Sequence, residues 1–311
     1  MSKLDFALLT VALIVSGVYS GRHSSKKASD TAKFHRQSLS DEPLRQRHQK
    51  TPNENVKRIE LQNCTGAIGV STLSLFPKAQ KITIRDSAVE TFEPTLNLTD
   101  LIVIKSKFPT IEDTFALKFS SVKNLVLLDD DNVTVNPNSL KSFRNLSTLV
   151  LSKVQLATLH VTKDWFDGPA TLKQVNLAGN GIQEVAEDAF ERATSVVRLD
   201  LTNNNITSLA AKVFEPLKKI KELGLYGNPL KIDLTTFEVM GDSLKVLGLP
   251  WESANQIDAK ELTAKLPKLK KVSFGRENLP QNAELEDFCA KLKEAKVHCK
   301  SDNVFNVAQL L

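Results

Sequence analysis

Residue types that carry chemistry are few in this chain, and they are scattered. His160 and His298 stand apart from other ligand-type side chains, and the other three of the five histidines lie near the N-terminus. A metal site needs His, Cys, Asp or Glu side chains at short, regular spacings, and the sequence has no such cluster. It also lacks a nucleophile-elbow motif, a P-loop and a dinucleotide fingerprint. We therefore expect no enzymatic activity, no cofactor and no metal site.

The densest run of carboxylates is Asp129-Asp130-Asp131. A calcium loop spaces its oxygen ligands regularly along the chain, and three consecutive aspartates lack that spacing. We expect a solvated turn here rather than a calcium site.

Two of the three cysteines lie close together near the C-terminus. Cys289 and Cys299 belong to LEDFCAKLKEAKVHC, where four residues trace one face of a helix: Leu285, Phe288, Leu292 and Ala295. Ten helical residues would hold the two cysteines about 15 Å apart, so a bridge requires the chain to turn back after about Lys296. In a secreted chain we favour the bridge over two free thiols.

The N-terminus has the features of a secretory signal. Phe6–Val18 is an apolar run that is too short to span a bilayer, which takes about 20 residues, and Val18-Tyr19-Ser20 resembles a cleavage site. No later run is long enough for a membrane span, and the tail Ser301–Leu311 is too short for a lipid-anchor signal. We expect residues 1–20 to be a signal peptide and the product to be secreted. Five N-x-Ser/Thr glycosylation sites agree with that route: Asn63, Asn97, Asn132, Asn145 and Asn205.

Positive charge is concentrated ahead of the main body. The formal net charge is +5, from 41 Lys+Arg against 36 Asp+Glu, which is too mild to indicate nucleic-acid binding. Residues 21–55 hold eight basic and four acidic residues but only two large aliphatic ones, Leu39 and Leu44. Such a stretch cannot bury enough apolar surface to offset the entropy of ordering, so we predict a disordered basic arm over 21–55.

The 43 leucines follow a 24-residue repeat. Three stretches align without a gap from Leu172, Val196 and Ile220: LKQVNLAGNGIQEVAEDAFERATS, VVRLDLTNNNITSLAAKVFEPLKK and IKELGLYGNPLKIDLTTFEVMGDS. Each reads L-x-x-L-x-L-x-x-N-x-L, and the apolar fourth and sixth places are typical of a short strand. The ninth place holds Asn180, Asn204 and Asn228, and the return limb holds Phe190, Phe214 and Phe237. One unit cannot bury its own apolar face, so the units must stack.

Looser copies of the unit extend the array in both directions. We predict an α/β leucine-rich-repeat solenoid over residues 56–282, followed by a C-terminal helical cap and tail over 283–311. The solenoid is expected to be a curved horseshoe of about ten coils, with a parallel β-sheet on the concave face and irregular or helical return limbs. Cys64 occupies the ninth place of the first coil, where it replaces the ladder asparagine as a buried thiol; an intermolecular disulfide is the alternative.

This pattern resembles the extracellular leucine-rich-repeat family over about three quarters of the chain. The signal peptide, ragged repeats, few cysteines and lack of a membrane span are most similar to the short, coil-less kind of secreted mosquito and insect leucine-rich immune proteins. Those proteins usually carry more cysteines, and their longer members add a C-terminal coiled coil that this chain lacks. The resemblance implies an extracellular recognition or complex-forming role and names no ligand.

The repeat register predicts a row of lysines along one rim. The second place of the repeat carries Lys173 and, after Val197 in the next coil, Lys221, Lys245 and Lys270 in three consecutive coils. Neighbouring coils stack about 4.8 Å apart, so this file would give weak, salt-sensitive attachment to anionic glycans or lipid headgroups. A solvated flank that keeps the protein soluble is the alternative.

Residues at the fifth and seventh places should point outward from the concave sheet. In the third to fifth coils they are apolar: Ile102, Ile104, Val126, Leu128 and Val150. We predict an exposed patch that forms a dry interface with a protein partner or a second copy of the chain. Its polar rim would be Arg85, Lys105, Asp129 and Lys153. The alternative is that the arm or a loop covers the face.

Two functions follow from these features. The first is a secreted, non-enzymatic recognition module of the innate immune type, which binds a protein or a microbial surface through the concave face. The second is a structural or adhesive matrix protein, which binds anionic glycans through the basic arm and the lysine rim.

Overall fold

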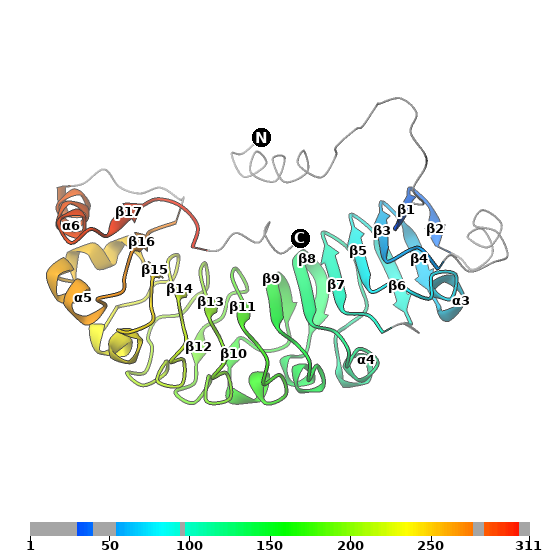
Figure 1. The fold of residues 1–311 in the computed structure, drawn as a ribbon, viewed down its shortest axis with the longest axis horizontal. Coiled ribbons are helices and arrows are strands. Elements are labelled where there is room, and N and C mark those ends of the chain that lie inside the picture. Colours follow the sequence, from blue (N-terminus) through cyan, green and yellow to red (C-terminus); the bar gives the residue numbers. More distant parts are fainter. Residues whose placement is uncertain (1–29, 40–53, 94–96, 276–282, 305–311) are drawn as a thin grey trace, which may run out of the picture.

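A computed structural model describes residues 30–39, 54–93, 97–275 and 283–304. The chain forms an arc whose inner side is lined by a sheet of 12 parallel strands, while the return segments lie along the outer side (Figure 1). The expected signal peptide, residues 1–20, lies outside the described residues.

The strands of the main sheet follow one another in chain order. They are β1 (Thr31–His35), β3 (Arg58–Gln62), β5 (Lys81–Arg85), β7 (Asp100–Ile104), β8 (Asn124–Val135), β9 (Thr148–Leu156), β11 (Gln174–Asn176), β13 (Arg198–Asp200), β14 (Glu222–Gly224), β15 (Val246–Gly248), β16 (Lys271–Ser273) and β17 (His298–Lys300). Each coil thus contributes one strand and returns over the outer side, as predicted for the solenoid.

The return segments contain short strands and helices. Two small sheets are formed by β2 (Ser38–Leu39), β4 (Thr65–Ile68) and β6 (Ala88–Phe92), and by β10 (His160–Val161) and β12 (Glu184–Val185). The α-helices are α3 (Val70–Leu73), α4 (Asp113–Leu117), α5 (Ala259–Lys265) and α6 (Ala283–Glu294). The 3-10 helices are η1 (Pro137–Ser142), η2 (Lys163–Phe166), η3 (Leu234–Met240) and η4 (Trp251–Asn255).

The sheet begins one coil earlier than the repeats indicated. Strand β1 pairs in parallel with β3, and its Ala32 and Phe34 side chains are buried in the core. The prediction of a disordered arm over 21–55 is therefore wrong at residues 30–39. Two alternating apolar side chains suffice there because β1 adds to an existing core instead of building its own. Residues 21–29 and 40–53 of the predicted arm lie outside the described residues.

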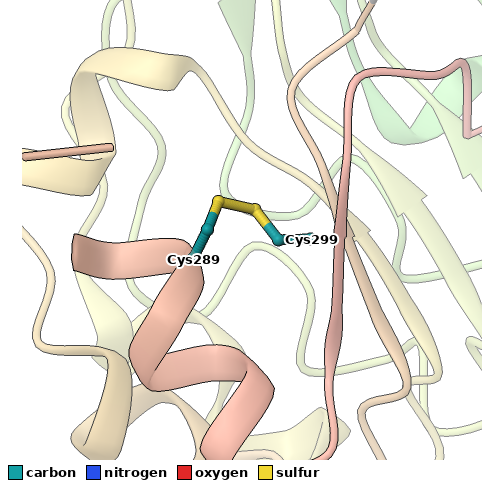
Figure 2. Close-up of a disulfide and its surroundings, with 2 residues drawn as sticks. All are labelled: Cys289 and Cys299. Atoms are coloured by element: carbon teal, nitrogen blue, oxygen red, sulfur yellow. A yellow bond between two sulfur atoms is a disulfide. The ribbon is translucent and has the colours of Figure 1, made fainter. Parts of the chain in front are cut away.

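The C-terminal cap is a helix and a strand joined by a disulfide. Helix α6 buries three side chains, Leu285, Phe288 and Leu292, and ends before Lys296, whose backbone φ is +61°. The chain turns back there, and β17 pairs with β16 as the last strand of the sheet. Cys289 on α6 and Cys299 on β17 form a disulfide with their Cα atoms 5.4 Å apart (Figure 2). The favoured bridge is confirmed, and the cap also contributes a strand that was not predicted.

Asparagines at the ninth place tie adjacent coils together. The Asn204 Oδ1 atom accepts hydrogen bonds from the backbone N–H groups of Asn180 and Ile182, at 3.0 and 3.1 Å. Its Nδ2 group donates to the carbonyls of Leu177 and Leu201, at 3.0 and 2.9 Å. Buried backbone N–H and C=O groups need hydrogen-bond partners, and the asparagine amide supplies these partners in turns where an apolar side chain could not.

The same place is filled differently in the first coils. Cys64 is a free thiol and is fully buried, and its Sγ lies 3.4 Å from the carbonyl of Gln62. Its backbone N–H donates to the Ser87 hydroxyl, and the N–H of Ser87 donates to the Ser106 hydroxyl. The prediction that Cys64 replaces the ladder asparagine is confirmed, because the thiol lies inside the ladder.

Replacement of Asn204 by alanine should destabilise the protein by about 2–4 kcal/mol, because it leaves the buried backbone N–H groups of Asn180 and Ile182 without their acceptor. The matched control is Asn205→Ala, an exposed neighbour in unglycosylated protein, which should cost less than about 0.5 kcal/mol. Chemical denaturation of both variants and the parent measures the difference. Equal midpoints for the two variants would show that the ladder contributes little.

Candidate functional site

The concave face of the sheet carries the side chains at the fifth and seventh places of each coil. In parallel register, the same place of each coil lies beside the same place of the next. Ile102 pairs with Val126, Val126 with Val150, and Ile104 with Leu128. The five predicted apolar residues therefore come together, across β7, β8 and β9.

These side chains form a cluster of their own, apart from the main core. It contains Ile102, Ile104, Val126 and Val150, with Leu128 packed against it, and we call these five residues the concave apolar cluster. Ile102, Val126 and Val150 are each 1% exposed and Ile104 is 7% exposed. The prediction of an exposed patch is wrong, because both faces of the sheet are buried at β7–β9.

The predicted rim residues lie at the edge of this cluster, where the strands end. Lys105, Asp129 and Lys153 share the eighth place of their coils and have left-handed backbones, with φ between 50° and 53°. Gly179 and Gly227 hold that place in later coils, so the conformation belongs to the repeat. Asp129 and Lys153 form an ion pair at 3.1 Å, and Lys105 is exposed.

Arg85 is the fourth predicted rim residue, and it is half-buried at the end of β5. Burial lowers the pKa of its guanidinium, while the charges of Glu60 and Asp86 act in the opposite direction. Arginine remains protonated under such conditions, so Arg85 adds a fixed positive charge beside Ile104.

The middle of the concave face is polar. The Asp200 carboxylate accepts hydrogen bonds from the Asn176 amide at 3.2 Å and from the Thr202 backbone N–H at 3.0 Å. Burial raises its pKa to about 6, although the two hydrogen bonds from Thr202 lower it. Asp200 therefore titrates in a pH range where ordinary carboxyl groups are already ionised.

The C-terminal part of the face has a floor of glycines. Tyr226 lies across Gly248 and Gly275: a Cβ added to either glycine would come within about 3 Å of its ring carbons. Burial raises the pKa of the Tyr226 phenol well above its usual range, and the charge of Asp200 adds to that effect. The phenol donates a hydrogen bond to Asn303 Oδ1 at 3.2 Å, so residues beyond β17 dock on this floor. Sequence reasoning missed this contact, although the glycines at concave places were a usable signal for it.

The predicted lysine file is present on one rim. The backbone N–H of Lys245 donates to the carbonyl of Lys221, and that of Lys270 donates to Lys245, each at 2.8 Å. Lys173 is one coil further away, because Val197 lies between it and Lys221. All four side chains are exposed, and none forms an ion pair with another described residue.

The remaining predicted positions lie far apart along the chain. Four glycosylation asparagines are exposed, namely Asn63, Asn97, Asn145 and Asn205, and Asn132 lies in β8. Asp129-Asp130-Asp131 also lies within β8, at a register shift against β9, so the expected turn is wrong.

In the described part of the chain, no group of three His, Cys, Asp or Glu side chains is arranged to hold a metal ion. Nor does any helix there combine the length and apolar character that a bilayer crossing requires.

Comparison with known proteins identifies the fold. Residues 170–230 match a family model described as leucine rich repeat. A chain of the solved octameric complex of Latrophilin 3 (Lec, Olf), Unc5D (Ig, Ig2, TSP1) and FLRT2 (LRR) superimposes with a TM-score of 0.56 at 18% sequence identity, over 83% of this chain and 88% of that chain. No curated protein matches the sequence. The chain is thus a leucine-rich-repeat solenoid, as predicted, and the resemblance to insect immune proteins gains no support from these matches.

The buried Asp200 predicts a pH dependence of stability. Its carboxyl binds a proton more tightly in the folded chain, with a pKa of about 6, than in the unfolded chain, with a pKa of about 4. Between these values the folded state holds more protons, so stability falls as the pH rises. Relative to Asp200→Asn, the parent should lose about 2 kcal/mol of unfolding free energy between pH 4 and pH 7. Denaturant unfolding at several pH values measures this difference, and a pH-independent difference would contradict the assignment.

Proposed function

We propose that this leucine-rich-repeat solenoid is an extracellular, non-enzymatic recognition module that binds a protein partner through the concave apolar cluster. One observation carries the proposal: the apolar side chains of the concave apolar cluster lie apart from the main core, and four of the five are nevertheless buried, while Leu128 is partly buried. A surface of this kind has its lowest free energy when another protein surface covers it.

The size of the cluster is adequate for recognition. When a partner displaces what covers the cluster, burying roughly 300 Å² of its apolar surface would contribute on the order of 7 kcal/mol before the costs of displacement and association. The charged residues at its edge, Arg85, Lys105, Asp129 and Lys153, supply the polar rim that interfaces of this class carry.

Several features support an extracellular location. The expected signal peptide, the Cys289–Cys299 disulfide and four exposed N-x-Ser/Thr asparagines all agree with passage through the secretory route. The similar solved chain comes from a complex of several proteins, which favours a role in protein assembly. The innate immune setting rests on the resemblance of the repeats and signal peptide to insect immune proteins.

Replacement of Ile104 and Leu128 by aspartate should abolish partner binding, because the partner would have to desolvate two carboxylates on an apolar surface. Leu117→Asp is the matched control, since Leu117 is 68% exposed and belongs to α4 on the outer side of the arc (Figure 1). Circular dichroism first establishes that each variant is folded. The tagged mature proteins are then used to capture partners from the extracellular fluid of the organism that produces the protein. A folded double variant that captures every partner of the parent would refute the proposal.

The lysine file supports a second candidate function, which is attachment to anionic glycans. Lys221, Lys245 and Lys270 belong to coils whose backbones are directly hydrogen-bonded, so three unpaired cations lie along one edge. Such a row attracts a linear polyanion, and salt weakens that attraction.

The triple variant Lys221→Gln/Lys245→Gln/Lys270→Gln should elute from immobilised heparin at a lower salt concentration than the parent, because the row of positive charge is lost. A control with the same change in net charge replaces three exposed lysines of the return segments by glutamine: Lys118, Lys141 and Lys212. Elution of both triple variants at the same salt concentration would show that the lysine file has no special role in glycan binding and is only a solvated flank.

A further inference from the structure

The concave apolar cluster requires a cover that its own members do not supply. Neighbouring side chains in one sheet shield each other's flanks, whereas their tips point away from the sheet. Val126 and Val150 are nevertheless 1% exposed. Of the described apolar residues, only the fifth member of the cluster, the partly buried Leu128, packs against its four buried members.

The last described residues return along the concave face. Asp302 forms an ion pair with Lys271 at 3.1 Å, and the Ser273 hydroxyl donates to the Asp302 backbone carbonyl, so the chain crosses β16 there. Asn303 then accepts the hydrogen bond from Tyr226, which follows β14. A side-chain carbon of Val304 would lie 2.6 Å from a Cβ added to Gly248 of β15. The segment after β17 thus heads back along the inner side of the arc toward β14 and β15 (Figure 1).

The residues that follow have the length and chemistry to reach the cluster. From β15 to β9 the sheet has four strand steps, and to β8 it has five, which amounts to about 19–24 Å at about 4.8 Å per step. The seven residues of Phe305–Leu311 span up to about 23–25 Å when extended. Five of them are apolar: Phe305, Val307, Ala308, Leu310 and Leu311.

We propose that Phe305–Leu311 crosses the polar middle of the concave face and packs its last two apolar side chains, Leu310 and Leu311, on the concave apolar cluster at β9 and β8. The solenoid then carries an intramolecular cover, and an extended apolar segment is the kind of ligand that this face accepts. This inference rests on the proposed function for one consequence, which is that an external partner must displace the segment. The occupancy itself needs no partner.

The test measures how accessible the cluster is to a thiol reagent. Val126→Cys introduces a thiol into the cluster, while Cys64 is buried and Cys289 and Cys299 are bridged, so the new thiol is the reactive one. The full chain carrying Val126→Cys is compared with the same chain carrying Leu310→Asp/Leu311→Asp, and with a chain that ends at Val304. Maleimide labelling should become at least about tenfold faster in both, because local protection is lost. Leu117→Cys, an exposed thiol on α4, should react at one rate in every background.

Three outcomes would overturn the inference. Labelling of Val126→Cys could remain unchanged in both tail variants. It could instead accelerate only after removal of residues 1–29, which would assign the cover to the N-terminal segment. It could also depend on protein concentration in the full chain, which would assign the cover to a second copy. None of these outcomes involves partner capture, so they are distinguishable from a failure of the proposed function.

Discussion

Parallel stacking of the coils in a constant register determines which side chains face the core and which face the inner side of the arc. Each coil hydrogen-bonds to the next through residues that hold the same place in the repeat, from β1 to β17. A shift of one residue would exchange the core-facing side chains with the concave ones, as Leu101 and Ile102 illustrate. Buried asparagines such as Asn204 fix that register, because their amides fit the turns only when neighbouring coils are aligned.

Register also divides the concave face into chemically different zones. At one place of the repeat, the residues change from Ile102, Val126 and Val150 to Asn176 and Asp200, and then to Gly224 and Gly248. The first zone has an apolar surface, the second holds a buried carboxylate, and the third leaves room for Tyr226 and for the segment after β17. A chain that follows the inner side of the arc from its C-terminal end therefore crosses the glycines first, then the hydrogen-bonding residues Asn176 and Asp200, and finally the apolar cluster.

Much of this architecture could be predicted from the sequence, because the repeat fixes side-chain direction. The ninth-place asparagines, the return-limb phenylalanines and the turn before Cys299 are all where the spacing indicated. Strand β1 could not be predicted so readily, since TAKFH is surrounded by charged residues and its burial depends on β3. The sequence repeat also does not indicate which segment covers the concave face of the sheet. The continuous apolar runs LIVI in β7 and LVLL in β8 are typical of strands that are buried on both sides, and that signal was available.

In the proposed arrangement, the C-terminal residues of the chain cover the concave apolar cluster. Methyl NMR of the full chain, labelled at Ile, Leu and Val, tests this contact directly. If the segment lies there, nuclear Overhauser cross-peaks connect the methyl groups of Val126 and Val150 to those of Leu310 or Leu311, and a soluble paramagnetic agent broadens Ile102 only slightly. Cross-peaks confined to the cluster, together with strong broadening of Ile102, would contradict this arrangement.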